Sequence, residues 1–173
     1  MQTPRSLRKA LAAAFAVTAL AALPAPAAHS TPRDDDTIET GKSYYLVAPN
    51  AGNRGVTFEV STDNDWALLT NDENSNGTAV VFEKKGEDRY TVRSTSSNWP
   101  GYDTWCSTDK GIRLAKASSC ATAWKIVPDD TGFKLQEPNG RIICNPKSPK
   151  YWLKPASEVY SSEFTSFKAV ELA

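Results

Sequence analysis

The chain has 173 residues, 40% of them hydrophobic, with 20 Lys and Arg against 20 Asp and Glu. Because the two signs are balanced and interspersed, the charge gives no reason to expect binding to nucleic acid or to an anionic membrane surface. The single histidine, His29, lies close to the N-terminus. This position excludes Ser-His-Asp and Cys-His catalysis and histidine-ligated zinc from the folded body.

The N-terminal residues have the composition of an export signal. Three basic residues between positions 5 and 9 precede an apolar run over residues 10–23, and Ala25-Pro26-Ala27 supplies the small-x-small pattern that a signal peptidase needs. The apolar run is shorter than the ~20 residues of a membrane-spanning helix. We therefore expect residues 1–27 to be a signal peptide and the protein to be secreted.

The segment after this signal changes in character twice. Residues 28–40 are polar and charged without apolar periodicity, and we expect a flexible lead-in there. From residue 41 onward, short alternating apolar runs are separated by Gly, Pro, Asn and Asp, as is typical of strands and turns. No stretch of helical length keeps a 3.6-residue apolar period. We therefore predict one all-β domain over residues 41–173.

This domain contains three copies of a unit of about forty residues, a length typical of repeat-built folds. Residues 60–70 align without gaps on residues 106–116, and more loosely on residues 144–154. Twelve strands follow from the repeats, over residues 42–47, 57–61, 66–70, 79–83, 89–93, 104–108, 111–116, 123–127, 132–136, 141–145, 151–154 and 166–171. Twelve antiparallel strands in three pseudo-repeats, with the first and last strands paired, describe a β-trefoil, and closure removes exposed sheet edges. Aromatic side chains at equivalent places are expected in the core, among them Tyr45, Tyr90, Trp124, Phe133 and Phe167.

Motifs over residues 40–127 add a family resemblance. The opening strand has a glycine, Gly41, followed by a Tyr-Tyr pair. Residues 66–70 are followed by an Asn-Gly-Thr-Ala-Val-Val run at 76–81, and residues 107–124 carry a Ser-Thr-Asp…Cys…Trp stretch. These features resemble the Kunitz soybean-trypsin-inhibitor family, which are secreted β-trefoils that block serine or cysteine proteases. The chain lacks the family's cysteine ahead of residue 66, and Thr40 replaces its loop-supporting asparagine.

The resemblance implies a protease-binding loop after the strand at residues 79–83, at Lys84, Lys85 and Gly86. A lysine in the primary contact position suits a trypsin-like pocket with an acidic floor, because its stem is buried while the ammonium pairs. The alternative is an ordinary solvated hairpin, since charge-rich turns are common.

A second candidate is the loop over residues 94–103, which contains Trp99, Pro100 and Tyr102. The equivalent connection at residues 137–140 is much shorter, and inserted loops often carry binding specificity. Trp and Tyr provide rigid contact area at low entropic cost. The alternative is that Trp99 folds back and caps the barrel end.

A basic and aromatic patch is a third possibility, at residues 147–152, where two lysines adjoin Tyr151 and Trp152. Two lysines on a turn are more often simply solvated.

A weaker resemblance links the repeats to ricin-type carbohydrate-binding modules. Residues 140–144 and 120–124 are similar to the layout of those modules, although Thr122 stands where their Gln-x-Trp signature has glutamine. This resemblance implies a galactose-type site only weakly.

Three cysteines, Cys106, Cys120 and Cys144, remain in the body of the chain. In an oxidising compartment this number suggests one bridge. We predict Cys106–Cys120, a bridge within one repeat as in ricin-type modules, with Cys144 outside it. The competing pairs are Cys120–Cys144 and Cys106–Cys144.

Together these patterns predict a secreted, monomeric, non-enzymatic binding protein without a metal or cofactor, most simply an inhibitor of an extracellular protease. The alternative is a lectin-like module that binds a glycan through a pocket on one repeat. Neither interpretation involves nucleic acid or a membrane.

Overall fold

Alternation of side chains determines which face of each strand is buried. In β1 (Ser43–Ala48), Tyr44, Leu46 and Ala48 are buried, whereas Tyr45 is partly exposed. Successive side chains of a strand point to opposite faces, so only one member of the Tyr-Tyr pair can enter the core. The prediction that Tyr45 is a core residue is therefore wrong, and Tyr44 takes that place.

The computed structural model describes residues 38–146, 150–156 and 165–172, all within the compact unit Pro32–Ala173. The predicted signal peptide and most of the predicted lead-in lie outside these residues. The described elements are β1 and the following: η2 (Pro49–Ala51), β2 (Arg54–Ser61), β3 (Asn64–Leu69), β4 (Val80–Lys84), β5 (Arg89–Ser94), β6 (Thr104–Thr108), β7 (Gly111–Ala115), η3 (Ala117–Ser119), β8 (Trp124–Asp129), β9 (Gly132–Gln136), β10 (Ile142–Cys144), β11 (Lys154–Ala156) and β12 (Lys168–Glu171).

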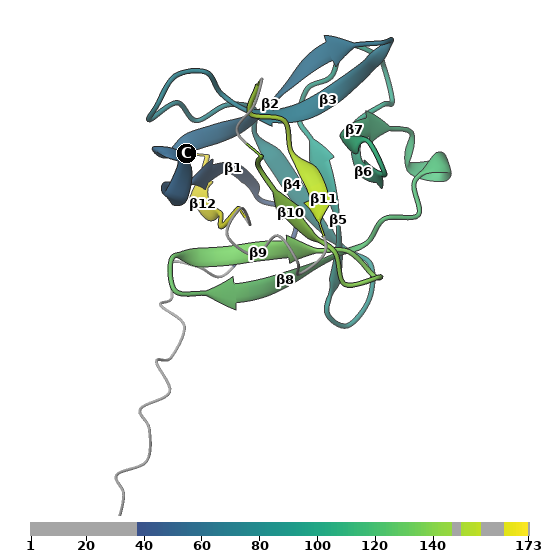
Figure 1. The fold of residues 1–173 in the computed structure, drawn as a ribbon. Coiled ribbons are helices and arrows are strands. Elements are labelled where there is room, and N and C mark those ends of the chain that lie inside the picture. The colour runs from purple at the N-terminus through teal and green to yellow at the C-terminus, as the bar shows by residue number, and fades with distance from the viewer. Residues whose placement is uncertain (1–37, 147–149, 157–164, 173) are drawn as a thin grey trace, which may run out of the picture. The chain divides into compact units, whose positions relative to one another are not determined.

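The strands pair antiparallel and close into a barrel. A ring runs through β1, β2, β3, β7, β6, β5 and β4 and returns to β1. The strands β8, β9, β10 and β11 extend from β5 in that order. Figure 1 shows β12 beside β1, and the register pairs Tyr44 with Glu171 and Val47 with Lys168. The predictions of an all-β fold and of paired first and last strands are confirmed.

The observed strands follow the predicted ones closely, with two exact matches in β6 and β9. The largest difference is at the strand predicted over residues 151–154, because β11 begins only at Lys154. The residues just before it bond to β3 and β7. The Leu69 amide donates to the Tyr151 carbonyl at 2.8 Å, the Leu153 amide donates to the Ala67 carbonyl at 2.9 Å, and the Ile112 amide donates to the Leu153 carbonyl at 3.1 Å. This segment therefore joins two hairpins instead of extending the β10–β11 pair.

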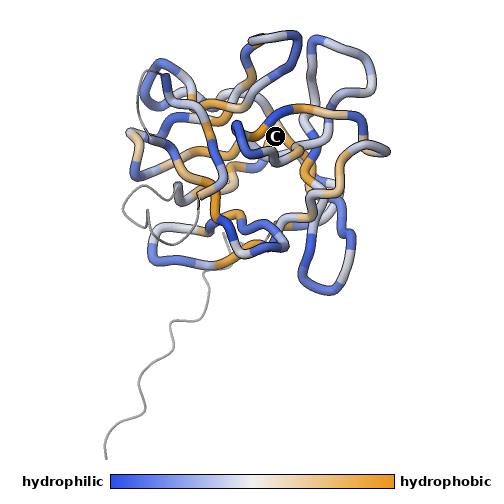
Figure 2. The backbone as a smooth tube through the Cα atoms, turned by 45° about the vertical axis from the view of Figure 1, so that its right-hand side comes forward, coloured by the Kyte–Doolittle hydropathy of each residue, from blue (hydrophilic) through white to orange (hydrophobic). Residues whose placement is uncertain are grey.

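The hydrophobic core lies inside the barrel that the strands form. Its largest fully buried side chains include the predicted Trp124, Phe133 and Phe167, whereas Tyr90 is partly buried against it. Figure 2 shows hydrophobic stretches along the strands and hydrophilic residues at the hairpin tips. Within the described ranges, no helix is long and apolar enough to cross a membrane.

Candidate functional site

The predicted protease-binding loop is the tip of the β4–β5 hairpin. Lys84 pairs with Tyr90 in the ladder, and the Lys85 amide donates to the Arg89 carbonyl at 2.9 Å. Lys84, Lys85 and Gly86 are exposed. Neither ammonium forms an ion pair with any residue that the structure describes. The tip therefore presents two available cations on a hairpin held by backbone hydrogen bonds.

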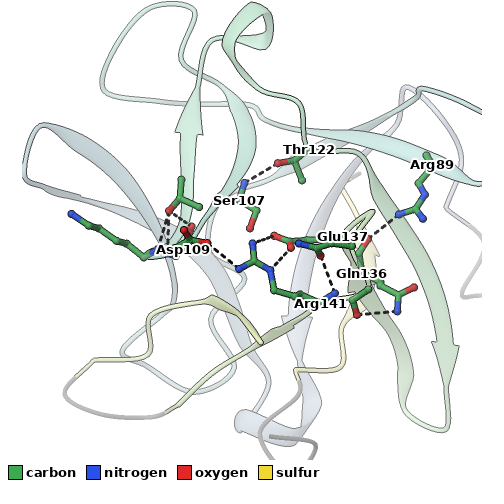
Figure 3. Close-up of polar contacts among 12 residues, drawn as sticks. Arg89, Ser107, Asp109, Thr122, Gln136, Glu137 and Arg141 are labelled. Carbon is green, nitrogen blue, oxygen red and sulfur yellow. Dashed lines mark hydrogen bonds and ion pairs between the residues drawn. The ribbon is translucent and has the colours of Figure 1, made fainter. Parts of the chain in front are cut away.

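The side of the tip where β5 begins is fixed to the neighbouring strands. The Arg89 guanidinium donates to the Ala123 carbonyl at 3.4 Å and to the Gln136 carbonyl at 3.5 Å. Figure 3 shows Arg89 directed toward Gln136. Lys125 approaches the Asp88 carboxylate at 2.9 Å, and its hydrogen bond lowers the pKa of Asp88 below the ordinary value. Contacts with β8 and β9 thus restrain the position of the tip.

The aromatic loop (residues 94–103) contains a type II turn. The Tyr102 amide donates to the Trp99 carbonyl at 3.1 Å, with Pro100 and Gly101 at the central positions. The φ of Gly101 is 77°, which a type II turn requires at this position and which glycine adopts without strain. Trp99 is half-buried, Pro100 is exposed, and Tyr102 is 39% exposed beneath the Lys116 ammonium.

Two carboxylates hold this loop. Asp65 in β3 is 1% exposed and accepts hydrogen bonds from the Asn98 amide at 2.9 Å and from its Nδ2 at 2.6 Å. At the other end, Arg93 pairs with Asp103 at 2.5 Å. Burial opposes ionisation of Asp103, but the hydrogen bonds and charge of Arg93 outweigh it and lower the pKa of Asp103. The loop is therefore anchored at its middle and at its end.

The structure does not bring the two candidate loops together. The hairpin tip precedes β5 and the aromatic loop follows it, so they lie at opposite ends of this strand. Six residues at ~3.3 Å per residue separate them by about 20 Å. One partner that contacts the hairpin tip would have to extend along the whole strand to reach the aromatic loop.

The predicted disulfide is confirmed. It joins Cys106 at the middle of β6 to Cys120 after η3, with a Cα–Cα distance of 5.5 Å. Beside it, the Ser107 amide donates to Thr122 Oγ1 at 3.0 Å (Figure 3). Cys144 is buried and lies outside the bridge. The bridge and the adjacent hydrogen bond tie the segment leading into β8 onto β6.

Sequence reasoning missed one feature, a groove with two tryptophans, Trp66 and Trp152. Trp152 belongs to the basic and aromatic patch considered above, and of that patch residues 147–149 lie outside the described residues. The only local signal in the sequence was the presence of Trp152. The groove itself depends on a tertiary contact, an isolated bridge between Trp152 and Leu68 that brings residue 152 against β3. A contact over more than eighty residues has no local signature.

The comparisons with known proteins concern the fold. No protein-family profile and no characterised sequence matches the chain. The fold resembles that of Kunitz-type trypsin inhibitors. A bifunctional trypsin/amylase inhibitor from Alocasia macrorrhiza tubers superposes with a TM-score of 0.64 at 12% identity, over 78% of this chain and 92% of that one. Soybean trypsin inhibitor, in its complex with porcine pancreatic trypsin, gives a TM-score of 0.63 at 8% identity, over 79% of this chain and 94% of that one.

Other proteins share the fold as well. Lysenin in complex with phosphocholine gives a TM-score of 0.62 at 12% identity, and the match covers 79% of this chain. The chain spans about half the length of lysenin, 46% of it. Similarity at these identities defines an architecture that several binding proteins use, and function must be argued from the site.

Proposed function

We propose that this protein is a secreted, non-enzymatic inhibitor of a trypsin-like extracellular protease and that Lys84 or Lys85 is its primary contact. The observation that carries the proposal is the exposed β4–β5 tip. Both lysines lack an ion-pair partner among the described residues, while the contacts of Asp88 and Arg89 with β8, β9 and the segment before β8 restrain the position of the tip. A partly restrained loop loses less conformational entropy on binding than a flexible one.

The chemistry of lysine fits this role. Its four-carbon stem can be buried along apolar pocket walls while its ammonium pairs with a carboxylate at the pocket floor. Trypsin-like proteases provide such a floor. The inhibitors that share this fold support the same partner class, since one of them was solved bound to trypsin.

The detailed architecture belongs to the proposal. We infer a three-repeat β-trefoil, because Val56, Trp105 and Ile143 lie in the first strands of the hairpins β2–β3, β6–β7 and β10–β11, and each is 0% exposed. Two repeats share a hydrogen bond at this place: the Thr78 amide donates to the Val56 carbonyl at 2.7 Å, and the Thr165 amide donates to the Ile143 carbonyl at 3.0 Å.

Secretion rests on two independent features. Residues 1–27 have the pattern of a cleaved signal peptide. The Cys106–Cys120 disulfide supports an oxidising compartment, since disulfides are rare in reducing ones. N-terminal sequencing of the exported protein tests this part, and cleavage after Ala27 is the expected result.

Inhibition assays test the activity. Secreted protein is titrated against trypsin-like, subtilisin-like and papain-like proteases, and inhibition of the trypsin-like enzyme is expected. Replacing the lysine that makes the primary contact, Lys84→Ala or Lys85→Ala, should weaken inhibition about 30-fold, because loss of a buried anchor costs ~2 kcal/mol. Lys168→Ala removes an exposed lysine on β12 and serves as the matched control.

Two outcomes count against the proposal. Unchanged inhibition by both lysine variants would transfer the contact to the aromatic loop, where Trp99→Ala then becomes the decisive variant. Absence of inhibition across all three protease classes would refute the inhibitor function itself.

A further inference from the structure

A groove of about 240 Å³ lies between two hairpins and the segment before β11, and neither candidate loop contributes a residue to its lining. It is bounded by the β2–β3 hairpin, the β6–β7 hairpin and the segment leading into β11. Its lining consists of Ser61, Thr62, Trp66, Ala67, Lys110, Gly111, Trp152, Leu153 and Lys154. The volume is slightly below the ~300–1,000 Å³ of pockets for drug-sized ligands, so it suits one or two rings of a longer molecule.

Backbone hydrogen bonds hold the walls of the groove together. The Leu153 amide donates to the Ala67 carbonyl at 2.9 Å, and the Ile112 amide donates to the Leu153 carbonyl at 3.1 Å. Residue 153 therefore links β3 and β7 directly. Because these bonds join two hairpins to the segment before β11, the walls of the groove are part of the fold itself.

Two half-buried tryptophans supply its apolar surface. The Trp66 indole nitrogen donates to the Ser61 carbonyl at 2.8 Å, which fixes the orientation of the ring. Gly111 leaves room for that ring, since a Cβ at this position would lie 3.3 Å from it. Trp152, in the segment before β11, is half-buried as well. Rigid indole faces beside the hydroxyls of Ser61 and Thr62 match the mixture of apolar faces and hydroxyls on a sugar ring.

The charge of the lining has one sign. It includes the exposed lysines Lys110 and Lys154 and no carboxylate. Neither lysine forms an ion pair with a residue in the described part of the chain. A third lysine, Lys150, lies 5.6 Å from the centre of the Trp152 ring, but its charge is engaged by Glu59.

The acidic neighbour of Lys110 is directed elsewhere. Asp109 pairs with Arg141 at 3.2 Å, and Arg141 is in turn held by the buried Glu137 at 2.6 Å. Figure 3 shows the Arg141 guanidinium between these two carboxylates. The charge of Asp109 is thus shared with Arg141, and Lys110 remains available to an anion.

From this combination we propose that the groove binds an acidic saccharide. One sugar ring packs against Trp66 and Trp152, and its carboxylate or sulfate pairs with Lys110 and Lys154. The site is separate from the hairpin tip at Lys84 and Lys85, so it is a second binding function that does not depend on protease inhibition.

Titration of the secreted protein with three probes tests this inference. The probes are a tetragalacturonate, a heparin-derived tetrasaccharide and neutral cellotetraose. Binding is measured by tryptophan fluorescence and by calorimetry. At least one acidic probe should bind about tenfold more tightly than the neutral one, and the difference should shrink as salt rises, because exposed charges are screened. The Lys110→Ala/Lys154→Ala double variant should lose this difference, whereas Lys168→Ala should keep it.

Further variants separate the aromatic contact from folding. Trp152→Ala should abolish binding, and Trp152→Phe should retain part of it, because phenylalanine preserves an aromatic face; thermal unfolding identifies variants that fail to fold. Failure of both acidic probes to bind, equal binding of the neutral probe, or full binding by the double lysine variant would each overturn the proposal. Loss of acidic-saccharide binding in Lys84→Ala/Lys85→Ala would place the ligand at the hairpin tip and would overturn it too.

Discussion

Replacing Cys106 and Cys120 by alanine opens a bridge between residues separated by 14 positions. In the chain-entropy model, closing a loop of this size removes enough freedom from the unfolded chain to stabilise the native state by about 3 kcal/mol. For a domain of this size, 1 kcal/mol corresponds to roughly 3–4 °C, so the melting temperature should fall by about 10 °C. Urea unfolding followed by tryptophan fluorescence measures the free energy of unfolding directly.

Non-additivity makes this prediction sharp. Either single variant, Cys106→Ala or Cys120→Ala, already opens the bridge, so each should lose about as much stability as the double variant. Cys144→Ala keeps the bridge and is the matched control for loss of a buried sulfur atom. Single-variant losses that add up in the double variant, or a double-variant loss below ~1 kcal/mol, would refute the assignment of the stabilisation to loop closure.

Three further predictions concern the polar anchors. Asp65→Ala should cost about 1–3 kcal/mol and speed hydrogen exchange in the aromatic loop, because two hydrogen bonds from that loop lose their acceptor. Arg141→Met should cost about 2 kcal/mol in urea unfolding, since it leaves the buried Glu137 carboxylate without its partner; this is less than for a fully buried pair because Arg141 is 30% exposed. The pKa of Asp103 is lowered in the folded protein, so its pairing with Arg93 stabilises the fold fully at pH values above the ordinary carboxyl pKa. This stabilisation is lost as the pH falls through the lower pKa of the folded state. Asp103→Asn should therefore reduce the fall of the melting temperature at acid pH.

Each of these predictions has a result that would contradict it. Unchanged exchange in the loop of the Asp65→Ala variant would show that the loop does not depend on this anchor. Glu137→Gln added to Arg141→Met should restore stability in part, and no recovery would exclude an unpaired carboxylate as the cause. An acid-induced loss that is the same in wild type and Asp103→Asn would assign that loss to other carboxylates.

The sequence alone determined the local features of the fold. Alternation, turn residues and the repeats placed eleven strands close to their observed positions, and β6 and β9 matched their predicted bounds, because strand and turn preferences depend on neighbouring residues; only β11 lies mostly outside its predicted range. Cys106–Cys120 was the pair predicted from the sequence, with two competing pairs left open, and the Cα–Cα distance of 5.5 Å in the fold selects it.

The repeat alignment was less exact in the turns. It placed Thr62 opposite Thr108, but Thr62 and Asp63 have φ values of 47° and 59° and form the β2–β3 turn, whereas Thr108 pairs with Gly111 at the end of β6. The sign of φ at a hairpin turn depends on the turn type: Ser61 pairs with Asn64, and a two-residue loop with positive φ at both central residues is a type I′ turn.

Only the tertiary structure decided the features that carry the binding proposals. The anchor from Asp65 to Asn98 spans 33 positions, and the groove brings Trp66 in β3 beside Trp152 in the segment before β11. Whether two such residues meet depends on the register and packing of the whole barrel, which no short window of sequence encodes. The tertiary structure also decides whether a lysine forms an ion pair, because the fold determines which carboxylates lie within its reach. The lysines that lack such a partner among the described residues are Lys84, Lys85, Lys110 and Lys154.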